Sequence, residues 1–277
     1  MPDNTDDEPL DNPTNTQPEN PSEEIIITKY TETTNTSQPQ QKKPNYGIDA
    51  PRMGLALTFI VIAMTIAGFF LRVSNNETAK SAAGIIFSIA PTGIILIILI
   101  LLYIKVEKFR HRDRMLNMLS WKGDEQVLDI GTGKGLLMIG AAKRLTSGKS
   151  FGIDIWNKTD LSNNTYEAAM RNAELEGVKD KVDIRNADAQ NIPFKDRSFD
   201  YVLSNLCIHN INNKKGRAIA CNEIARVLKP GGIALISDFM HTTEYENEFK
   251  TAGLQTNRSF SFLIAPVLLY IVKVTKK

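Results

Sequence analysis

Two long apolar runs dominate the first half of the chain. The stretches 53–71 and 82–104 contain no charged residue, and the connection 72–81 is short and polar. At about 1.5 Å per helical residue, each run can span a hydrocarbon core of roughly 30 Å. The pattern therefore predicts a two-helix transmembrane hairpin over 51–104, with a local bend at Pro91 because proline removes a helix hydrogen bond. A buried hairpin of a large soluble protein is the alternative, but no neighbouring segment is apolar enough to cover one.

After residue 125 the pattern changes to short apolar strands that alternate with helix-length segments. Such alternation is typical of a parallel sheet with helices on both faces. Residues 126–277 are therefore predicted to form a doubly wound α/β domain, with one helix over 164–176 and a later one around Ile224. The predicted strands are Gln126–Ile130, Ser150–Ile155, Val182–Asn186, Phe199–Ser204, Gly232–Ser237 and Val267–Val274.

The first fifty residues differ in composition from the rest. They are rich in Asn, Thr, Pro and Gln, carry ten acidic residues against three lysines, and contain one apolar run, 25–27. Too little apolar surface is present to offset the entropy of ordering, so residues 1–50 are predicted to be a disordered acidic tail. A solvated spacer and a docking site for a protein partner both fit this composition. A signal peptide does not, because no short basic region followed at once by an apolar one starts the chain.

Positive charge flanks the apolar runs at their outer ends. The second run is followed by Lys105, Lys108, Arg110, Arg112 and Arg114, and the first is preceded by Lys42, Lys43 and Arg52. The connection between the runs carries only Arg72 and Lys80. The positive-inside rule then places both ends of the hairpin in the cytoplasm. Residues 105–125 are predicted to be a juxtamembrane basic helix and linker, whose charges would also suit an anionic lipid surface.

A glycine-rich turn follows the first predicted strand directly. The chain reads Val127-Leu128-Asp129-Ile130-Gly131-Thr132-Gly133-Lys134-Gly135 and continues into a helix. Glycines let the backbone turn sharply and lie close to a ligand at the free N–H groups of a helix N-terminus. In open α/β sheets the ligand crevice lies beyond the carboxyl ends of the strands, at such a turn. The loop alone does not separate a nucleotide site from a plain turn.

Spacing and acidic residues narrow this choice. The dinucleotide fingerprint needs glycine or alanine at position 136, where this chain has Leu136. Asp154 ends the second predicted strand, where a carboxylate can accept hydrogen bonds from both hydroxyls of a ribose. Asp188 follows the third predicted strand, beside the same crevice. Each acid alone could be a helix cap or a surface charge, but Asp129, Asp154 and Asp188 at three successive strand ends are harder to obtain by chance.

Four segments carry a resemblance to one enzyme family. VLDIGTGKG at 127–135, GIDI at 152–155, ADAQNIPFKDRSFDYVLSNLCIHNI at 187–211 and ARVLKPGG at 225–232 are similar to the class I S-adenosylmethionine-dependent methyltransferases, in the same order. The resemblance implies a Rossmann-like seven-stranded sheet and S-adenosylmethionine as cofactor. NYGIDAP at 45–51 and the two predicted spans resemble a membrane-anchored bacterial subgroup, which implies an integral protein of the bacterial inner membrane.

The resemblance also implies which residues hold the cofactor. All of them lie in the glycine loop or at strand ends: Asp129, Gly131 and Gly133 at the methionine end, Asp154 on the ribose hydroxyls, Ile155 on the adenine ring, Asp188 and Ala189 at the adenine amine, and Asn205, through its backbone, at the methionine amino group. The turn at ARVLKPGG is predicted to be structural. Lys134 is predicted to be a surface charge, with a substrate contact as the alternative.

Candidates for a catalytic base are few. The methyl group of a sulfonium is already electrophilic, so only a nucleophile that starts protonated needs a base. His209, Asp238 and His241 lie at or just after predicted strand ends and are the candidates, each with a structural role as the alternative. The two cysteines have no metal-ligand spacing, so no metal site is predicted.

The predicted anchoring bears on the methyl acceptor. A helix over 105–120 would hold the cofactor site roughly 20–25 Å from the bilayer. This favours a lipid-soluble acceptor, such as a quinone precursor or a phospholipid, over a soluble small molecule, which stays open. No nucleic-acid partner is expected, because no basic stripe with interleaved aromatic residues is present. A membrane scaffold that binds cofactor or a protein without catalysis is the alternative of another class, and a nicotinamide-dependent oxidoreductase is disfavoured by Leu136.

Overall fold

The computed structural model describes residues 43–48, 51–157, 159–264 and 267–277. The prediction of a disordered tail falls largely on residues 1–42, which lie outside the described residues. The chain divides into two units, Met1–Lys42 and Lys43–Lys277, and the described residues all belong to the second. Within it, residues 45–48 do not belong to a free tail: Tyr46 is buried, and the Asn45 N–H donates to Asn172 Oδ1 at 2.9 Å.

Two antiparallel helices form the hairpin that the apolar runs predict. Helix α2 covers Pro51–Arg72 and helix α3 covers Glu77–Leu102. The second helix begins earlier than predicted, because the Asn76 side chain accepts hydrogen bonds from the Thr78 and Ala79 N–H groups and so caps it. The helices approach closely at glycines: a Cβ at Gly93 would lie 2.5 Å from a methyl of Val61.

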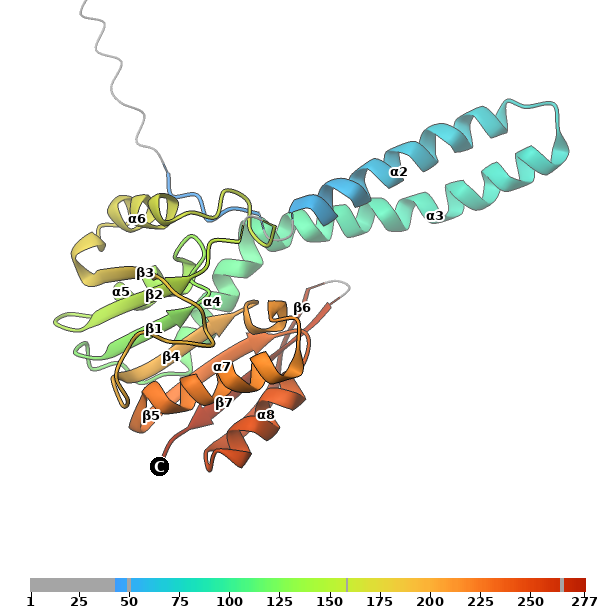
Figure 1. Ribbon diagram of the computed structural model, residues 1–277. Helices are drawn as coiled ribbons and strands as arrows, with labels where there is room; N and C mark the ends of the chain where they lie inside the picture. Colours follow the sequence, from blue (N-terminus) through green and yellow to red (C-terminus); the bar gives the residue numbers. More distant parts are fainter. Residues whose placement is uncertain (1–42, 49–50, 158, 265–266) are drawn as a thin grey trace, which may run out of the picture. The chain divides into compact units, whose positions relative to one another are not determined.

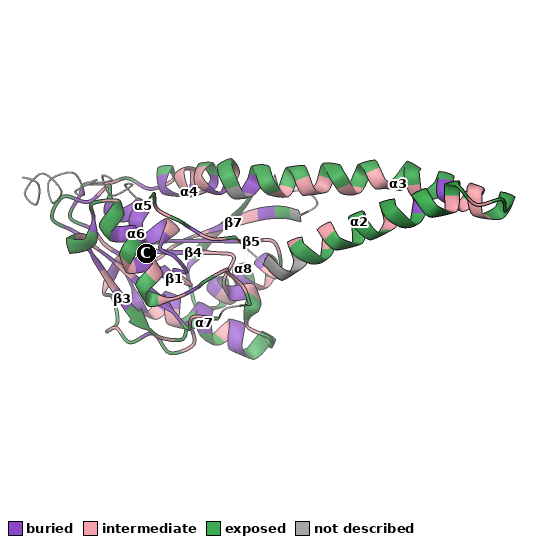
Figure 2. Ribbon diagram, turned by 90° about the horizontal axis from the view of Figure 1, so that it is seen from above, coloured by how far each residue is buried: buried purple, intermediate pink, exposed green. Residues whose placement is uncertain are grey.

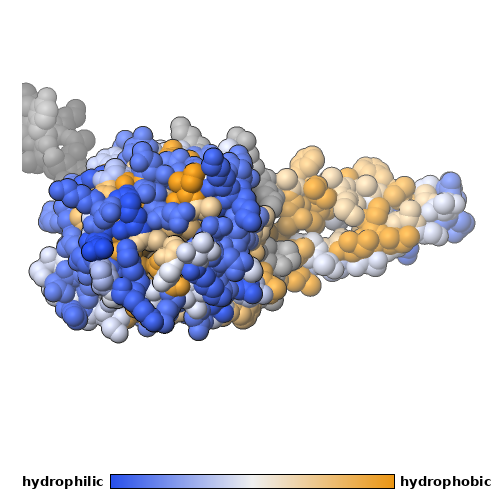
Figure 3. All heavy atoms as spheres, turned by 60° about the horizontal axis from the view of Figure 1, so that its bottom comes forward, coloured by the Kyte–Doolittle hydropathy of each residue, from blue (hydrophilic) through white to orange (hydrophobic). Residues whose placement is uncertain are grey.

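Both hairpin helices are long and apolar enough to cross a membrane. Most of their large apolar side chains are exposed, and Phe59 reaches 73%. Figure 3 shows the hairpin as largely orange with blue residues at its far end, next to a mostly blue domain surface. Apolar surface of this extent is unusual on a soluble protein and indicates a partner or a membrane.

The segment after the hairpin contains a basic helix, which the sequence predicts within 105–125, and this helix packs on the α/β domain. The helical path continues from α3 through a π-helical turn, Tyr103–Glu107, into α4, Lys108–Asn117 (Figure 2). On α4, the buried residues Lys108, His111, Met115 and Leu116 face the domain. Met115 and Leu116 pack with Leu137 and Leu203 in one core cluster. The basic segment is therefore the first helix of the α/β domain, because its apolar residues complete that domain's core.

A seven-stranded sheet forms the centre of this domain, as predicted. The strand order is β3-β2-β1-β4-β5-β7-β6, with β1 to β5 parallel and β7 antiparallel to both of its neighbours (Figure 1). The strands are β1 Gln126–Ile130, β2 Lys149–Asp154, β3 Val182–Asn186, β4 Phe199–Asn205, β5 Leu228–Asp238, β6 Gln255–Ile264 and β7 Val267–Thr275. The order in which successive strands join the sheet reverses between β1 and β4, and open α/β sheets bind ligands at such a switch point.

Helices cover both faces of the sheet. The remaining elements are α5 Leu136–Ala142, α6 Tyr166–Leu175, α7 Lys214–Val227, α8 Thr242–Thr251 and the short 3-10 turns Lys179–Lys181 and Ile208–Asn210. Neighbouring strand residues point to opposite sides: Val127 packs in the cluster with α4 and α5, and Leu128 in the cluster with α7 and α8. The doubly wound arrangement is therefore confirmed.

The carboxyl-terminal part holds two elements that the sequence pattern did not reveal. Helix α8 and strand β6 precede β7, where only a final strand over 267–274 was predicted. On α8 the side chains of Tyr245 and Phe249 are fully buried, and the rest of the helix is mostly polar. Two apolar residues four positions apart are too weak a signal to predict a helix from sequence.

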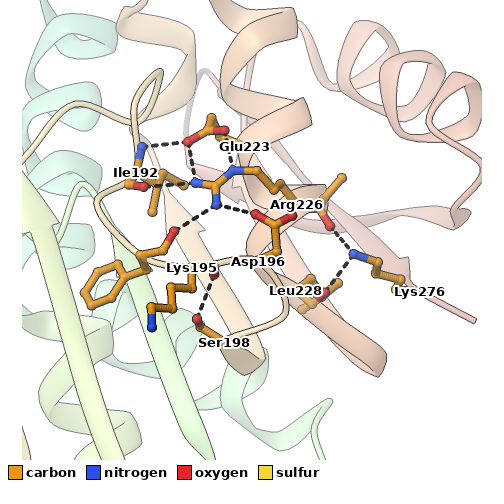
Figure 4. A network of polar contacts seen from close by, with 10 residues as sticks. Ile192, Lys195, Asp196, Ser198, Glu223, Arg226, Leu228 and Lys276 are labelled. Atoms are coloured by element: carbon orange, nitrogen blue, oxygen red, sulfur yellow. Dashed lines mark hydrogen bonds and ion pairs between the residues drawn. The ribbon is translucent and has the colours of Figure 1, made fainter.

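The loop between β3 and β4 is held by Arg226 of α7 (Figure 4). The guanidinium donates to the carbonyl oxygens of Ile192 and Phe194 at 2.9 and 2.8 Å, and pairs with Glu223 at 2.7 Å and Asp196 at 2.8 Å. Charge-assisted hydrogen bonds of this kind fix geometry strongly. The residues that follow β3 at the crevice are therefore attached to a rigid helix.

Candidate functional site

The glycine loop joins β1 to α5 with three residues at positive φ. Gly131, Gly133 and Gly135 have φ values of 71°, 53° and 85°. The Gly131 and Thr132 N–H groups both donate to the Ile153 carbonyl, at 2.9 and 3.0 Å. A Cβ at Gly131 would lie 2.3 Å from the Cys207 sulfur, so only glycine fits there. The glycine loop thus passes close to the segment after β4. Its glycines carry no side chains that would cover the backbone, which lies open toward the carboxyl ends of the strands.

Asp154, the last residue of β2, ties this loop to the next strand end. Its carboxylate accepts from the Gly133 N–H at 2.8 Å, the Trp156 N–H at 2.6 Å and the Asn164 amide at 3.2 Å. A carboxylate has about four acceptor positions, so room for a further donor remains. The residue is almost completely buried, yet it lines a cavity.

This larger cavity has a volume of about 370 Å³ and lies beyond the carboxyl ends of β1, β2 and β4. Seven of the eight residues predicted to hold the cofactor line it: Gly131, Gly133, Asp154, Ile155, Asp188, Ala189 and Asn205. Ile155 is exposed, and Asp188 accepts from the Gln190 N–H at 2.8 Å. These residues come from four separate loops. Their order along the chain was evident from the sequence, and the structure brings them together around one cavity.

Side-chain amides make up much of the remaining wall of this larger cavity. Sequence reasoning did not predict a role for these side chains, which belong to Asn157, Asn164, Gln190, Asn205 (singled out for its backbone only), Asn210, Asn212 and Asn213. The signal was present as two asparagine-rich stretches, one after β2 and one after β4. Three carboxylates, those of Asp154, Asp160 and Asp188, also line the cavity, and no lysine or arginine is among its described lining residues. Such a wall favours a neutral or positively charged ligand.

A smaller cavity of about 70 Å³ lies on the other side of the glycine loop. It shares Gly131, Gly133, Leu161 and Asn205 with the larger one. Its other lining residues include Tyr46, Tyr103, Lys108, Asp129 and Lys134, so both positive and negative groups face it. The Lys108 ammonium donates to the carbonyl oxygens of Tyr46 and Gly47 at 3.2 and 2.6 Å, which attaches the segment before α2 to this site.

Asp129 and Lys134 have unusual surroundings in this smaller cavity. Asp129 accepts from the Thr132 hydroxyl and the Met138 N–H, both at 3.0 Å, and burial raises its pKa to about 7. Lys134 is only 5% exposed, so the prediction of a surface charge is wrong. Burial lowers the pKa of its ammonium group, which has no hydrogen bond or ion pair within the part of the chain that the structure describes.

Asn205 stands between the two cavities. Its side-chain oxygen is buried and has no hydrogen-bond partner among the described residues. An unpaired buried acceptor is costly and is usually satisfied by a ligand or a water molecule. The next residue, Leu206, has a φ of 53°, and its N–H donates to the Ser237 carbonyl at 2.9 Å, which holds this corner in place.

The three candidate bases lie outside both cavities. His209 Nδ1 lies 2.7 Å from Asp238 Oδ1, and the His209 N–H donates to Asp238 Oδ2 at 3.1 Å. Asp238 has no exposed surface and also accepts from the Phe239 N–H. His241 directly precedes α8, and its Nδ1 lies 3.7 Å from Glu244 Oε2. These contacts join the loops after β4 and β5, so the geometry supports a structural role more directly than a catalytic one.

His111 of α4 forms a buried polar connection that the sequence did not predict. Its Nε2 lies 2.8 Å from Ser237 Oγ and its Nδ1 3.2 Å from Ser261 Oγ. Burial, together with the nearby positive charge of Arg114, lowers the pKa of His111 to about 4, and the neighbouring Asn205 side chain and Glu107 charge partly offset this. The imidazole is therefore neutral at pH 7 and connects α4 to the strand ends at the site.

This low pKa predicts a pH dependence of stability. Between pH 6.5 and about 4 the unfolded chain binds a proton at His111 and the folded chain does not. The free energy of unfolding should therefore fall as the pH is lowered through that window, by up to about 1.4 kcal/mol per pH unit from this group. Asp129, with its raised pKa, acts in the opposite direction, so the comparison must be with a variant.

Denaturant unfolding of the wild type and of His111→Gln in detergent micelles, from pH 7.5 to 4, isolates the contribution of His111. The stability difference between the two proteins should shrink steadily below pH 6.5, because glutamine does not titrate. A difference that stays constant with pH would show that His111 has an ordinary pKa in the folded protein.

Comparison with known proteins agrees with this geometry. Residues 128–236 match a family model described as "Methyltransferase domain". The matched segment begins in β1 and ends in β5, and so contains the glycine loop, Asp154 and Asp188. The chain carries a class I S-adenosylmethionine-dependent methyltransferase domain. S-adenosylmethionine is the cofactor of this class, and the anionic, amide-lined cavity next to the glycine loop fits a cation that contains a ribose.

Curated relatives of the methyltransferase domain cover part of the chain. An uncharacterized protein of Haemophilus influenzae is 35% identical over 137 residues, which is 47% of this chain and 51% of the relative. A sterol 24-C-methyltransferase of Gibberella zeae is 33% identical over 50% of this chain and 34% of its own length. A ubiquinone/menaquinone biosynthesis C-methyltransferase of a Ruegeria species is 30% identical over 46% of this chain and 48% of its own. The chain thus spans about half or less of each relative.

Solved structures share the fold of the methyltransferase domain at low sequence identity. An S-adenosylmethionine-dependent methyltransferase structure from Methanococcus maripaludis aligns with a TM-score of 0.50 and 18% identity, over 64% of this chain and 89% of that one. The structure of the [4+2]-cyclase SpnF aligns with a TM-score of 0.51 and 16% identity, over 61% and 81%. Similarity at this level shows a common fold and leaves the reaction open.

Proposed function

We propose that the protein is a membrane-anchored methyltransferase that moves the methyl group of S-adenosylmethionine to a small, lipid-soluble acceptor. The observation that carries the proposal is the arrangement at Asp154: a buried carboxylate that holds the glycine loop and also lines the larger cavity. The curated relatives that are named as methyltransferases support the reaction class.

The adenosine part of the cofactor fits the larger cavity. Asp154 has acceptor capacity left for ribose hydroxyls, and the exposed side chain of Ile155 offers an apolar surface for the adenine ring. Asp188 lies on the cavity wall with an exposed carboxylate that can accept from the adenine amine, beside the Ala189 N–H. The lining amides can donate or accept without adding charge.

The methionine part fits toward the smaller cavity. Asp129, the unpaired side-chain oxygen of Asn205 and the loop backbone around Gly131 and Gly133 can accept from an amino group or donate to a carboxylate. The unpaired ammonium of Lys134 would complement a carboxylate at the same place. When bound, S-adenosylmethionine supplies a methyl group on a sulfonium, so the protein mainly has to align the acceptor and exclude water.

The relation of the site to the hairpin supports a lipid-soluble acceptor. Helix α4, which the sequence suggests as a spacer between the bilayer and the site, packs along the domain through Met115 and Leu116. Tyr103, which directly follows α3, is itself a lining residue of the smaller cavity. An acceptor that leaves the bilayer beside α3 therefore has a short path to the cofactor, and two relatives are named for sterol and quinone methylation.

The topology is part of the proposal. Basic residues flank the hairpin at both outer ends, and by the positive-inside rule this supports a domain on the cytoplasmic side of a bacterial membrane. Protease added to intact cells should leave the domain uncut. Its digestion there, without prior lysis, would contradict this orientation.

A second candidate function is cofactor binding without methyl transfer. It is favoured by one observation, the similar fold of SpnF, which is named for a cyclisation reaction. Full-length protein in native membranes, incubated with S-adenosylmethionine labelled in its methyl group, separates the two. If the protein transfers the methyl group, the lipid extract should contain the label, and the extract from an otherwise identical Asp154→Asn sample should not. Cofactor binding with no label in lipid, protein or aqueous products would favour the second function.

A further inference from the structure

The ribbon formed by β6 and β7 extends past the carboxyl edge of the rest of the sheet. Strand β5 ends at Asp238, which pairs with Tyr270, whereas β7 begins at Val267 and remains paired with β6 up to Ile264. The first residues of β7 therefore have no β5 residue beside them. This end of the ribbon projects on the side of the sheet where both cavities lie.

Exposed apolar side chains lie on the projecting end and at its base. Leu268, on the projecting end, is 47% exposed, and Phe260, level with the last residue of β5, is 57% exposed and packs edge-on against Tyr270 at a ring distance of 5.9 Å. The sequence contains no charged residue between Arg258 and Lys273. Met240, just after β5, is also an exposed large apolar residue at this edge. A free sheet edge of this composition would be prone to aggregate unless it is covered.

The same end lies next to the helix that leads out of the hairpin. Ser261 of β6 contacts His111 and Arg114 of α4. Figures 1 and 2 both show β6 and β7 running toward the side on which α2 and α3 extend. Since Tyr103 lines the smaller cavity, the end of α3, the cavities and the ribbon tip share one edge of the domain. The exposed basic residues Lys105 and Arg110 also lie on this part of the helix.

We propose that the β6–β7 ribbon end is a second membrane contact, which dips into the headgroup region of the bilayer that α2 and α3 cross. This inference rests on the proposed membrane anchoring. Apolar side chains with a basic rim are the composition that binds to an anionic lipid surface. With two contacts at one edge, the domain is held with its cavities directed to the bilayer, and a lipid-soluble acceptor reaches the cofactor without crossing water.

A fluorescent probe on a single introduced cysteine tests this contact in the full-length protein. Burial raises the pKa of both native thiols, but Cys207 lines the larger cavity, so the protein without an introduced cysteine is labelled in parallel as the background. Leu268→Cys places the probe on the ribbon end. Leu175→Cys, on α6, is the matched control with a similar exposed fraction, 38%. Phe59→Cys, on α2, reports the anchoring itself.

The labelled proteins are placed in lipid nanodiscs that contain one-third anionic phospholipid, with one chain per disc, and quenching by brominated lipids is measured. We expect several-fold stronger quenching at position 268 than at position 175, and strong quenching at position 59. Quenching at 59 with equal, weak quenching at 268 and 175 would overturn the ribbon contact and leave the anchoring intact. Weak quenching at 59 would contradict the anchoring itself, and with it the contact. The emission of the probe at position 268 is also compared between discs that hold one chain and discs that hold two. An emission shift seen only with two chains per disc would assign the surface to a second copy and also overturn the proposal.

Discussion

Replacing Asp154 by asparagine is expected to weaken S-adenosylmethionine binding by at least about 100-fold. In the wild type, the Gly133 N–H donates to one oxygen of the Asp154 carboxylate and the Trp156 N–H donates to the other. In either orientation of the introduced asparagine, its NH₂ group faces one of these N–H donors, and that hydrogen bond is lost. The charge that ribose hydroxyls would meet is lost as well. Hydrogen bonds to charged groups contribute about 1.5–3 kcal/mol each, and 1.4 kcal/mol corresponds to tenfold in affinity.

Calorimetric titration of the full-length variant with S-adenosylmethionine measures this loss. Asp160→Asn is the matched control, because Asp160 lines the same cavity but makes no hydrogen bond to the glycine loop. That variant should bind within a few-fold of the wild type. Equal affinities for Asp154→Asn and the wild type would remove Asp154 from the cofactor site.

Replacing Gly131 by alanine is expected to destabilise the domain by about 3 kcal/mol or more and to abolish cofactor binding. Two costs add at this position. A residue with a side chain at a φ of 71° costs about 1–2 kcal/mol, and the new methyl would lie 2.3 Å from the Cys207 sulfur. The loop after β4 or the glycine loop must move, and either movement displaces the cavity wall.

Gly177→Ala provides the control for the backbone cost alone. Gly177 has nearly the same φ, 70°, and a Cβ there would meet no atom within 4 Å. Denaturant unfolding should give a loss of about 1 kcal/mol for Gly177→Ala, without change in cofactor affinity. Similar losses for both variants would show that the contact with Cys207 does not constrain the loop.

The central parts of the fold and of the larger cavity were predictable because their signals are local. Each parallel strand is a short apolar run, and Asp154 stands where β2 ends. The glycine loop needs positive φ at Gly131, Gly133 and Gly135, which one stretch of sequence encodes directly. Pairing order and cavity position then follow from the general rules of doubly wound sheets.

The smaller cavity was not predictable, because its walls come from segments with misleading or absent patterns. Helix α4 has the composition of a juxtamembrane linker, and its buried face shows only in His111, Met115 and Leu116. Tyr46 lies in a segment without periodicity and is fixed by its hydroxyl on Glu176, 130 residues away. Lys134 looked like a surface charge, since nothing in the sequence shows that α4 and Tyr46 cover it.

The roles of the candidate bases were not decidable from the sequence either. His209 and Asp238 lie after strand ends, as catalytic groups often do, and that position alone placed them among the candidates. In the folded chain they face each other at 2.7 Å behind the cavity wall. The position of a residue at the end of a strand shows at which edge of the sheet it lies. The packing of the folded chain decides whether its side chain faces the cavity or the interior.

The most direct test of the central claim is calorimetric titration of the full-length protein in lipid nanodiscs with S-adenosylmethionine, with NADH as the comparison. A fragment that begins at Lys105 would lack Tyr46 and Tyr103 and so would open the smaller cavity. Saturable binding of S-adenosylmethionine in the micromolar range, with no binding of NADH, is the predicted result. Folded protein that binds NADH, or that binds neither compound, would contradict the account.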